Sequence, residues 1–305
     1  MGIVLNQSFK NTLIVYLAFA VGGINTLFLY TRFLDEDYYG LVTFLLSSSN
    51  LLMPLTAFGV QYTIVKFYSS YESKLERDKF LSLAMVLPLL IAIPLGFLGS
   101  MFYEQISALL SIKNPIIKEY TYLIFIVAIF MGYFEVFYAW TKVHLKSVFG
   151  NFIKEIFPRF CTSFLLVAVY LKWLTNEQFI YGVVAVYGLS TLIMMLYAFY
   201  IYKPTLKFSL PNNIKELLSF SLYIIVAGSA GGILLEIDKF MIPQMEQIAQ
   251  VAYYSVGIYI ASVIAIPIRA MQQITSPITA KDMNDDNYVE VEKMYQQTSL
   301  NLLVV

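Results

Sequence analysis

The stretch KEYTYLIFIVAIFMGYFEVFYAW, residues 118–140, decides the class of fold. As a helix it would cross the hydrocarbon core of a bilayer, which is roughly 30 Å thick and requires about 20 apolar residues. Further apolar stretches of similar length occupy residues 11–31, 39–62, 80–103, 153–173, 177–202, 217–241 and 249–270. Another begins near Thr298 and continues to Val305. We therefore predict an all-α polytopic membrane protein with about eight transmembrane helices and the start of a ninth.

Composition supports a membrane protein and excludes several other classes. Of the 305 residues, 59% are hydrophobic and 13% are charged, and the mean hydropathy is +0.69, whereas about a quarter of the residues in soluble domains are charged. The net charge of zero gives no basic field for a nucleic-acid partner. The single cysteine, Cys161, excludes a disulfide framework. The first apolar stretch lacks a small-residue cleavage site, so we interpret it as a transmembrane helix rather than a signal peptide.

The Lys and Arg residues predict the orientation of the chain. With the N-terminus inside the cell, fifteen of them fall in inner segments and five in outer segments. Inner loops of membrane proteins carry an excess of these residues. We therefore predict a multi-pass protein with a cytoplasmic N-terminus and short outer loops.

Motifs of soluble enzymes are missing from the sequence. It contains no G-x-x-x-x-G-K-[ST], H-E-x-x-H, G-x-G-x-x-G or G-x-S-x-G pattern. The single histidine, His144, lies in a lysine-rich inner loop, where we expect it to be solvated. We predict a protein that is not an enzyme and that has no catalytic residue, metal site or cofactor.

A weak internal repeat predicts how the helices are grouped. Tyr16 precedes Tyr223 by 207 residues, and the pair Arg32-Phe33 precedes Lys239-Phe240 by the same number. Six predicted helices separate the copies, so both copies begin on the same side of the membrane, as in one class of transporter repeats. We predict a first six-helix bundle over residues 1–205 and the start of a second over residues 206–305.

Basic residues at membrane depth are candidates for binding an anionic substrate. A charge at the centre of a transmembrane helix costs about 2.5–3.5 kcal/mol on insertion scales, so such residues usually face a cavity or each other. Arg32, Arg159, Lys239 and Arg269 lie within or at the ends of the predicted helices. If they face one cavity, the ligand is an anion. Alternatively, those near helix ends extend to the lipid head groups.

Acidic and amide side chains at similar depth are further candidates. Glu135, Glu236 and Asp238 are candidates for coupling to Na⁺ or H⁺, and Asn25 and Asn50 for lining a cavity. Glu236 also lies three residues before a lysine, so the two side chains can simply pair. The polar run at residues 47–50 is suited equally to a cavity wall and to contacts between helices.

The sequence resembles the Wzx-type polysaccharide biosynthesis flippases of the multidrug/oligosaccharidyl-lipid/polysaccharide exporter superfamily. The resemblance is carried by residues 11–34 with 37–41, residues 56–60, and residues 236–242 with 251–255. It implies twelve to fourteen helices in two bundles around a central cavity. It also implies transport of undecaprenyl-pyrophosphate-linked oligosaccharide across the bacterial inner membrane, by alternating access and without ATP. Arg32 and Lys239 match the role of basic cavity residues, with Arg159 and Arg269 as further candidates.

The resemblance implies particular binding partners and leaves alternative functions open. The partners are the lipid bilayer, the lipid-linked oligosaccharide, a coupling ion and a polysaccharide polymerase, in the synthesis of surface polysaccharide such as O-antigen. Because the sequence ends within the ninth predicted helix, we expect it to be part of a longer transporter. A cation or multidrug antiporter and a lipid II flippase are alternatives from the same superfamily. A membrane glycosyltransferase or polymerase would need a large outer loop with catalytic residues, and the predicted outer loops are short.

Overall fold

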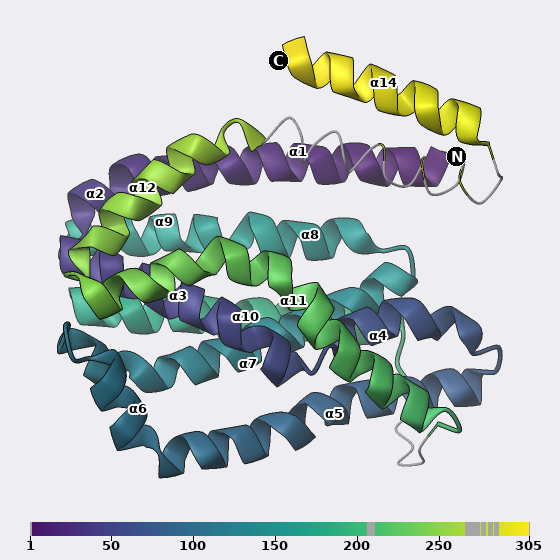
Figure 1. Ribbon diagram of the computed structural model, residues 1–305, viewed down its shortest axis with the longest axis horizontal. Helices are drawn as coiled ribbons and strands as arrows, with labels where there is room; N and C mark the ends of the chain where they lie inside the picture. Colours follow the sequence, from purple (N-terminus) through teal and green to yellow (C-terminus); the bar gives the residue numbers. More distant parts are fainter. Residues whose placement is uncertain are drawn as a thin grey trace.

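The computed structural model describes residues 2–205, 211–265, 275, 279, 283 and 287–304, and their regular elements are all helices (Figure 1). They are α1 (Gly2–Ile24), the π-helical turn η1 (Asn25–Leu29), α2 (Tyr30–Phe33), α3 (Glu36–Ala57), α4 (Val60–Phe67), the 3-10 turn η2 (Tyr68–Ser70), α5 (Lys74–Met101), α6 (Tyr103–Leu110), α7 (Ile116–Val143), α8 (Ser147–Glu155), α9 (Phe157–Tyr170), α10 (Asn176–Ile201), α11 (Ile214–Met245), α12 (Ala249–Ser262) and α14 (Tyr288–Val304).

Six helical stretches among the described residues are long and apolar enough to cross a membrane, which makes this a multi-pass membrane protein. They are Phe9–Phe33, Glu36–Ala57, Lys74–Met101, Ile116–Val143, Asn176–Ile201 and Ile214–Met245. The sequence predicted eight, so two predicted helices do not qualify by length. The stretch 153–173 is interrupted at Ile156, where α8 ends and α9 begins. Of the stretch 249–270, the structure describes the 14 residues of α12 and a short continuation to residue 265.

The helix at the end of the chain also differs from the prediction. It begins at Tyr288 rather than near Thr298, and its first turns carry charged residues such as Glu290. This helix, α14, has 17 residues and lies beyond α1 in Figure 1. Its length and composition do not qualify it as a membrane span.

Helices α3 and α7 form the centre of the molecule (Figure 1). They pack most extensively against each other, α7 also packs on α10, and α3 packs on α11 and α12. We call the end of the bundle that carries α6 and the α11–α12 turn the outer end, and the opposite end the inner end, following the orientation predicted from the charges. Helices α11 and α12 share a turn at the outer end and diverge toward the inner end (Figure 1).

Two apolar cores lie at the two ends of the bundle, with a polar zone between them. The outer core includes Phe44 of α3 and Phe179 of α10, and the inner core includes Trp140 of α7 and Met194 of α10. Hydroxyl groups link the helices in between. Thr56 Oγ1 donates to the Ala128 carbonyl at 3.0 Å, and Thr191 Oγ1 to the Phe130 carbonyl at 2.8 Å. Such hydrogen bonds join helices where apolar contact alone gives little specificity.

The predicted helix 39–62 is broken between α3 and α4. Phe58 and Gly59 both adopt left-handed backbone conformations, with φ of 50° and 63°. A Cβ atom at Gly59 would lie 2.8 Å from the Ser221 carbonyl oxygen of α11. Glycine therefore permits both the turn and the close approach of α11, and the break places the residues of α4 beside a cavity described below.

Candidate functional site

Three cavities adjoin helix α3 or its neighbours in the polar zone, and each has a volume of between about 220 and 260 Å³. The α7–α9 cavity is lined by Glu135, Lys154, Glu155, Arg159, Tyr187 and Asn50. The α3–α11 cavity is lined by Asn50, Gln61, Tyr62, Ser229, Gly232 and Glu236. The α3–α12 cavity is lined by Thr43, Tyr39, Lys239, Ser255 and Tyr259.

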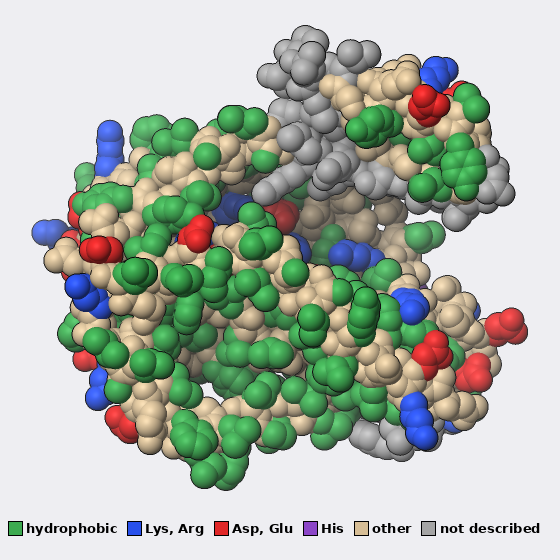
Figure 2. Space-filling model, viewed as in Figure 1, with side chains coloured by type: hydrophobic (Ala, Val, Ile, Leu, Met, Phe, Trp, Pro, Cys, Tyr) green, Lys and Arg blue, Asp and Glu red, His purple; other side chains and the backbone are tan. Residues whose placement is uncertain are grey.

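Two ion pairs occupy the α7–α9 cavity. Lys154 Nζ of α8 lies 2.6 Å from Glu135 Oε1 of α7, and Arg159 Nη1 of α9 lies 2.8 Å from Glu155 Oε2 of α8. The Glu135 side chain is 16% exposed, while that of Lys154 is 43% exposed. Figure 2 shows Lys and Arg side chains together with an acidic one inside a hollow below α1 and α12. Cationic side chains in a partly buried cavity are suited to binding an anionic group.

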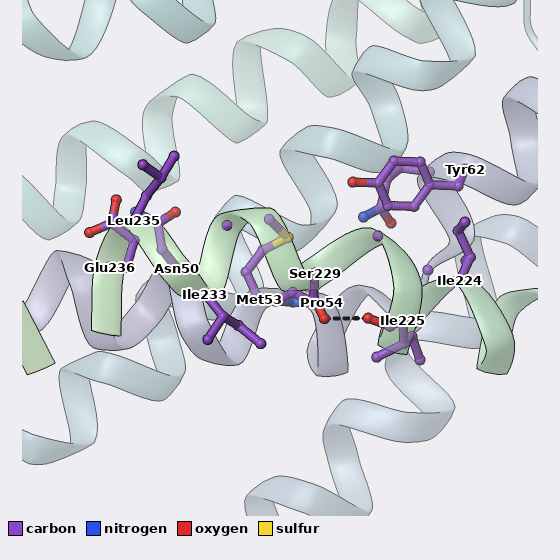
Figure 3. Close-up of a pocket in the computed structure, with 14 residues that line it drawn as sticks. Asn50, Met53, Pro54, Tyr62, Ile224, Ile225, Ser229, Ile233, Leu235 and Glu236 are labelled. Carbon is purple, nitrogen blue, oxygen red and sulfur yellow. Dashed lines mark hydrogen bonds between the residues drawn. The ribbon is translucent and has the colours of Figure 1, made fainter. Parts of the chain in front are cut away.

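The α3–α11 cavity lies between the α3–α4 break and the glycine-rich middle of α11 (Figure 3). Glu236 and Asn50 lie at one end of it and Tyr62 at the other (Figure 3). Glu236 accepts a hydrogen bond from Ser47 Oγ at 2.8 Å and pairs with Lys239 Nζ at 3.0 Å. Its charge is thus neutralised by a neighbour one helical turn away.

The α3–α12 cavity lies nearer the outer end. Lys239 lines it, together with Thr43 of α3 and Tyr259 of α12. The Tyr259 ring stacks on Phe19 of α1 with 4.7 Å between the ring centroids, and its hydroxyl donates to the Phe19 carbonyl. These contacts hold α12 against α1 above the cavity.

The three cavities are linked through shared walls. Asn50 and Met53 line both the α7–α9 and the α3–α11 cavities. The ion pair of Glu236 and Lys239 has one member in the α3–α11 cavity and the other in the α3–α12 cavity. Residues of α3 that line them are spaced three or four apart, so they share one face of the helix. That face therefore borders all three cavities in the polar zone.

The structure places four of the charged candidates in cavity walls. Arg159 and Glu135 line the α7–α9 cavity, Glu236 the α3–α11 cavity, and Lys239 the α3–α12 cavity. Arg159 and Lys239 are therefore in different cavities. The amide candidate Asn50 lines two of the cavities.

The remaining candidates lie elsewhere. Arg32 is exposed in the last turn of α2 and lines none of the three cavities. Asp238 is exposed and accepts a hydrogen bond from Tyr254 at 2.5 Å. Asn25 is buried and joins η1 to α9, because its Nδ2 donates to the Arg159 carbonyl at 2.7 Å. Arg269 lies outside the described residues.

Sequence reasoning missed three residues of this site, namely Lys154, Glu155 and Gln61. Lys154 and Glu155 were not among the candidates, and Lys154 is one of the fifteen basic residues assigned above to inner segments. Glu135 has no basic neighbour on its own helix, and only the packing of α8 on α7 supplies its partner. Gln61 gave no signal in the sequence, because the α3–α4 break that exposes it to the cavity was not predicted.

The polar run at residues 47–50 serves both predicted roles. Ser49 Oγ donates to the Ile124 carbonyl of α7 at 3.0 Å, so it joins helices. Asn50 lines cavities and Ser47 contacts Glu236, so these two belong to the site.

The expectation of a solvated His144 was wrong. Its Nε2 lies 2.9 Å from the Tyr68 hydroxyl, and its Nδ1 lies 2.8 Å from the Trp140 carbonyl, so Nδ1 is the donor there. The ring is partly buried among aromatic side chains, including Tyr202 at 5.1 Å between centroids. His144 therefore helps to join η2 to α7 at the inner end.

A buried amide fixes the α11–α12 turn at the outer end of the bundle. Asn114, between α6 and α7, is 7% exposed. Its Nδ2 donates to the carbonyls of Pro243 and Glu246 at 2.7 and 2.8 Å, and its Oδ1 accepts from the Ile248 amide at 2.9 Å. The α3 helix also meets this turn, because a Cβ atom at Gly40 would lie 2.1 Å from the Ile248 carbonyl oxygen. The α11–α12 turn is thus fixed to the rest of the bundle.

No group of three or more His, Cys, Asp or Glu side chains suited to a metal ion occurs among the described residues. The charged groups of the cavities instead form pairs of opposite sign. A family model described as polysaccharide biosynthesis protein matches residues 8–281. No curated protein sequence and no solved structure matches the chain.

Proposed function

The chain belongs to the polysaccharide biosynthesis protein family, and we propose that it flips lipid-linked oligosaccharide units from the inner to the outer leaflet of the bacterial inner membrane. The family is one of membrane flippases and transporters rather than of enzymes. We propose undecaprenyl pyrophosphate as the lipid carrier and alternating access as the mechanism. The transported unit would then be used for surface polysaccharide.

The α7–α9 cavity is the observation that carries this proposal. Lys154 and Arg159 both line this cavity, and two cations side by side suit a pyrophosphate group. Each cation is already held by a carboxylate, so an incoming pyrophosphate must take the place of Glu135 or Glu155. Glu135, released from Lys154 in this way, is our candidate for coupling transport to H⁺, and Na⁺ is the alternative coupling ion.

The membrane potential favours the proposed direction. Moving one negative charge outward across an inside-negative potential gains about 2.3 kcal/mol per 100 mV. The hydrogen bonds of Asn114 fix the α11–α12 turn to the bundle at the outer end, which supports entry of the substrate from the inner side. The cytoplasmic N-terminus remains the prediction made from the Lys and Arg distribution.

We also propose the helix arrangement that the family resemblance implies. In it, α8 and α9 together make one crossing and α12 makes another, which gives eight crossings in the described region. The first bundle would cover residues 1–205 and the second would begin at residue 206. The complete transporter would have twelve to fourteen helices in these two bundles.

A gene deletion with complementation tests the function. Loss of the gene should lower surface polysaccharide and trap the complete lipid-linked unit in the inner leaflet. Wild type and the control Lys113→Ala, at an exposed lysine before α7, should restore export, whereas Lys154→Ala and Arg159→Ala should not. Normal surface polysaccharide in the deletion strain would refute the proposal.

The same experiment separates the alternatives. A cation antiporter needs free acidic groups in its cavity, and Glu135 and Glu236 are both paired with lysines. Sensitivity of the deletion strain to cationic drugs would nevertheless favour the antiporter. Accumulation of lipid II would favour the peptidoglycan flippase. Loss of polymer with continued export of single units would point to the proposed polymerase partner.

A further inference from the structure

The α3–α11 cavity has a single carboxylate in its wall where its neighbour has two ion pairs, and we propose that it binds an acetamido-bearing sugar of the lipid-linked unit, with the Gln61 amide as the specificity-determining contact. This inference rests on the proposed function. Glu236, the charged residue in its wall, is paired with Lys239. The remaining polar wall groups are neutral amides and hydroxyls. The cavity therefore suits a neutral part of the substrate.

Gln61 is a buried polar group that lacks a protein partner. The residue is 7% exposed, and its Oε1 atom is buried without a hydrogen bond. Buried acceptors are almost always satisfied, by protein or by a bound molecule, because burial removes them from water. Gln61 lines the cavity just after the α3–α4 break. Because a flip of the amide exchanges its oxygen and nitrogen, this acceptor can be turned toward the cavity, where a ligand can supply the missing donor.

The chemistry of an acetamido group complements this wall. The group carries an N–H donor and a carbonyl acceptor, and the primary amides of Gln61 and Asn50 each offer both functions. Its methyl group needs an apolar surface, which Ile224, Ile225 and Ile233 of α11 provide. A hydroxyl at the same position of the sugar can replace neither the planar pair of hydrogen bonds nor the methyl contact.

The space in the cavity comes from glycines. Its volume is about 260 Å³. A Cβ atom at Gly232 would meet nothing within 4 Å, so this position faces open space. Gly228 and Gly59 also line the cavity without side chains. An apolar cavity with a few convergent polar groups is the usual form of a small-molecule site.

The shared wall of the two cavities suggests how the substrate lies. Asn50 and Met53 border both the α3–α11 and the α7–α9 cavities. A pyrophosphate beside Lys154 and Arg159 would place the sugar bonded to it next to Asn50, at the entrance of the α3–α11 cavity. The anionic part of the substrate would thus occupy the cavity with the two ion pairs, and its neutral part the adjacent cavity with the amide groups.

The test compares matched lipids on the purified protein in nanodiscs. The probes are polyprenyl-pyrophosphoryl N-acetylglucosamine and its glucose analogue, and in a second series the N-acetylgalactosamine and galactose pair. We expect wild type to bind one or both acetamido lipids about tenfold more tightly than the matching hydroxyl lipids, since one or two hydrogen bonds are at stake. Gln61→Leu should lower the ratio of the two affinities from about tenfold to about one.

Gln244→Leu is the matched control. Gln244 also carries a buried amide nitrogen without a partner, but it lines none of the three cavities. The Gln244→Leu variant should keep the tenfold preference for the acetamido lipids over the hydroxyl lipids. A purely structural role of Gln61 would change the thermal unfolding temperature of Gln61→Leu but not the ratio of the two affinities. Equal binding of both lipids by wild type would overturn the inference and leave the proposed function intact. Binding of neither lipid would count against both.

Discussion

Replacing Asn114 with alanine is expected to open the outer end of the bundle. The substitution removes three buried hydrogen bonds to the backbone between α11 and α12, with donor–acceptor distances of 2.7, 2.8 and 2.9 Å. Each contributes about 1 kcal/mol net, so the closed arrangement loses about 3 kcal/mol. In an open arrangement water satisfies the same backbone groups. The ratio of closed to open molecules should therefore fall by about 100-fold.

Thiol labelling in intact cells measures this opening without requiring transport. The chain has one cysteine, Cys161, so Cys161→Ala gives a background without thiols. Thr43→Cys then reports on the α3–α12 cavity. A membrane-impermeant maleimide added outside should react slowly with this reporter, and up to about 100-fold faster when Asn114→Ala is added.

A half-buried amide whose hydrogen bond lies at the surface of the same end is the matched control. Asn176 donates to Asp35 on the surface. Asn176→Ala should leave the labelling rate nearly unchanged, since exposed polar contacts contribute little. An equal labelling rate in Asn114→Ala and Asn176→Ala would refute the reasoning that the buried amide keeps the outer end closed.

Two further predictions follow from the helix contacts. Lys154→Ala should destabilise the protein by about 2 kcal/mol, or roughly 5 °C in a thermal unfolding assay in detergent, because it leaves Glu135 unpaired in a partly buried site. The charge-swapped double variant, Glu135→Lys with Lys154→Glu, should recover most of the lost stability. Failure to recover it would mean that the ion pair itself does not contribute to stability. Gly40→Ala should mimic Asn114→Ala in the labelling assay, because its Cβ would lie 2.1 Å from a carbonyl oxygen of the α11–α12 turn, whereas Gly99→Ala, with nothing within 4 Å, should label like wild type.

The membrane class of the protein could be predicted from the sequence because it depends on composition. Helix α7 was predicted at residues 118–140 and spans Ile116–Val143. A long apolar helix satisfies its own backbone hydrogen bonds, so its existence needs no knowledge of its neighbours. The expected helix at 153–173 was less well predicted, since hydropathy cannot detect the interruption at Ile156.

The partners of charged and polar side chains could be predicted only where they are close in sequence. The pair of Glu236 and Lys239 was one of two alternatives that their spacing of one helical turn allowed, and the structure contains it. Glu135 had no such neighbour, and its partner comes from another helix. Gln61 and Asn114 carried no sequence signal, because their importance arises from burial.

By itself the sequence determined that this chain is a helical membrane protein with charges at membrane depth, since both properties follow from local composition. The tertiary structure alone decided which charges meet, which side chains share a cavity and how the α11–α12 turn is held. Lys154 reaches Glu135, and Asn114 reaches the turn after α11, across 19 and more than 120 residues of chain. Contacts of this kind depend on how helices pack, and the packing depends on small features such as the left-handed turn at Gly59.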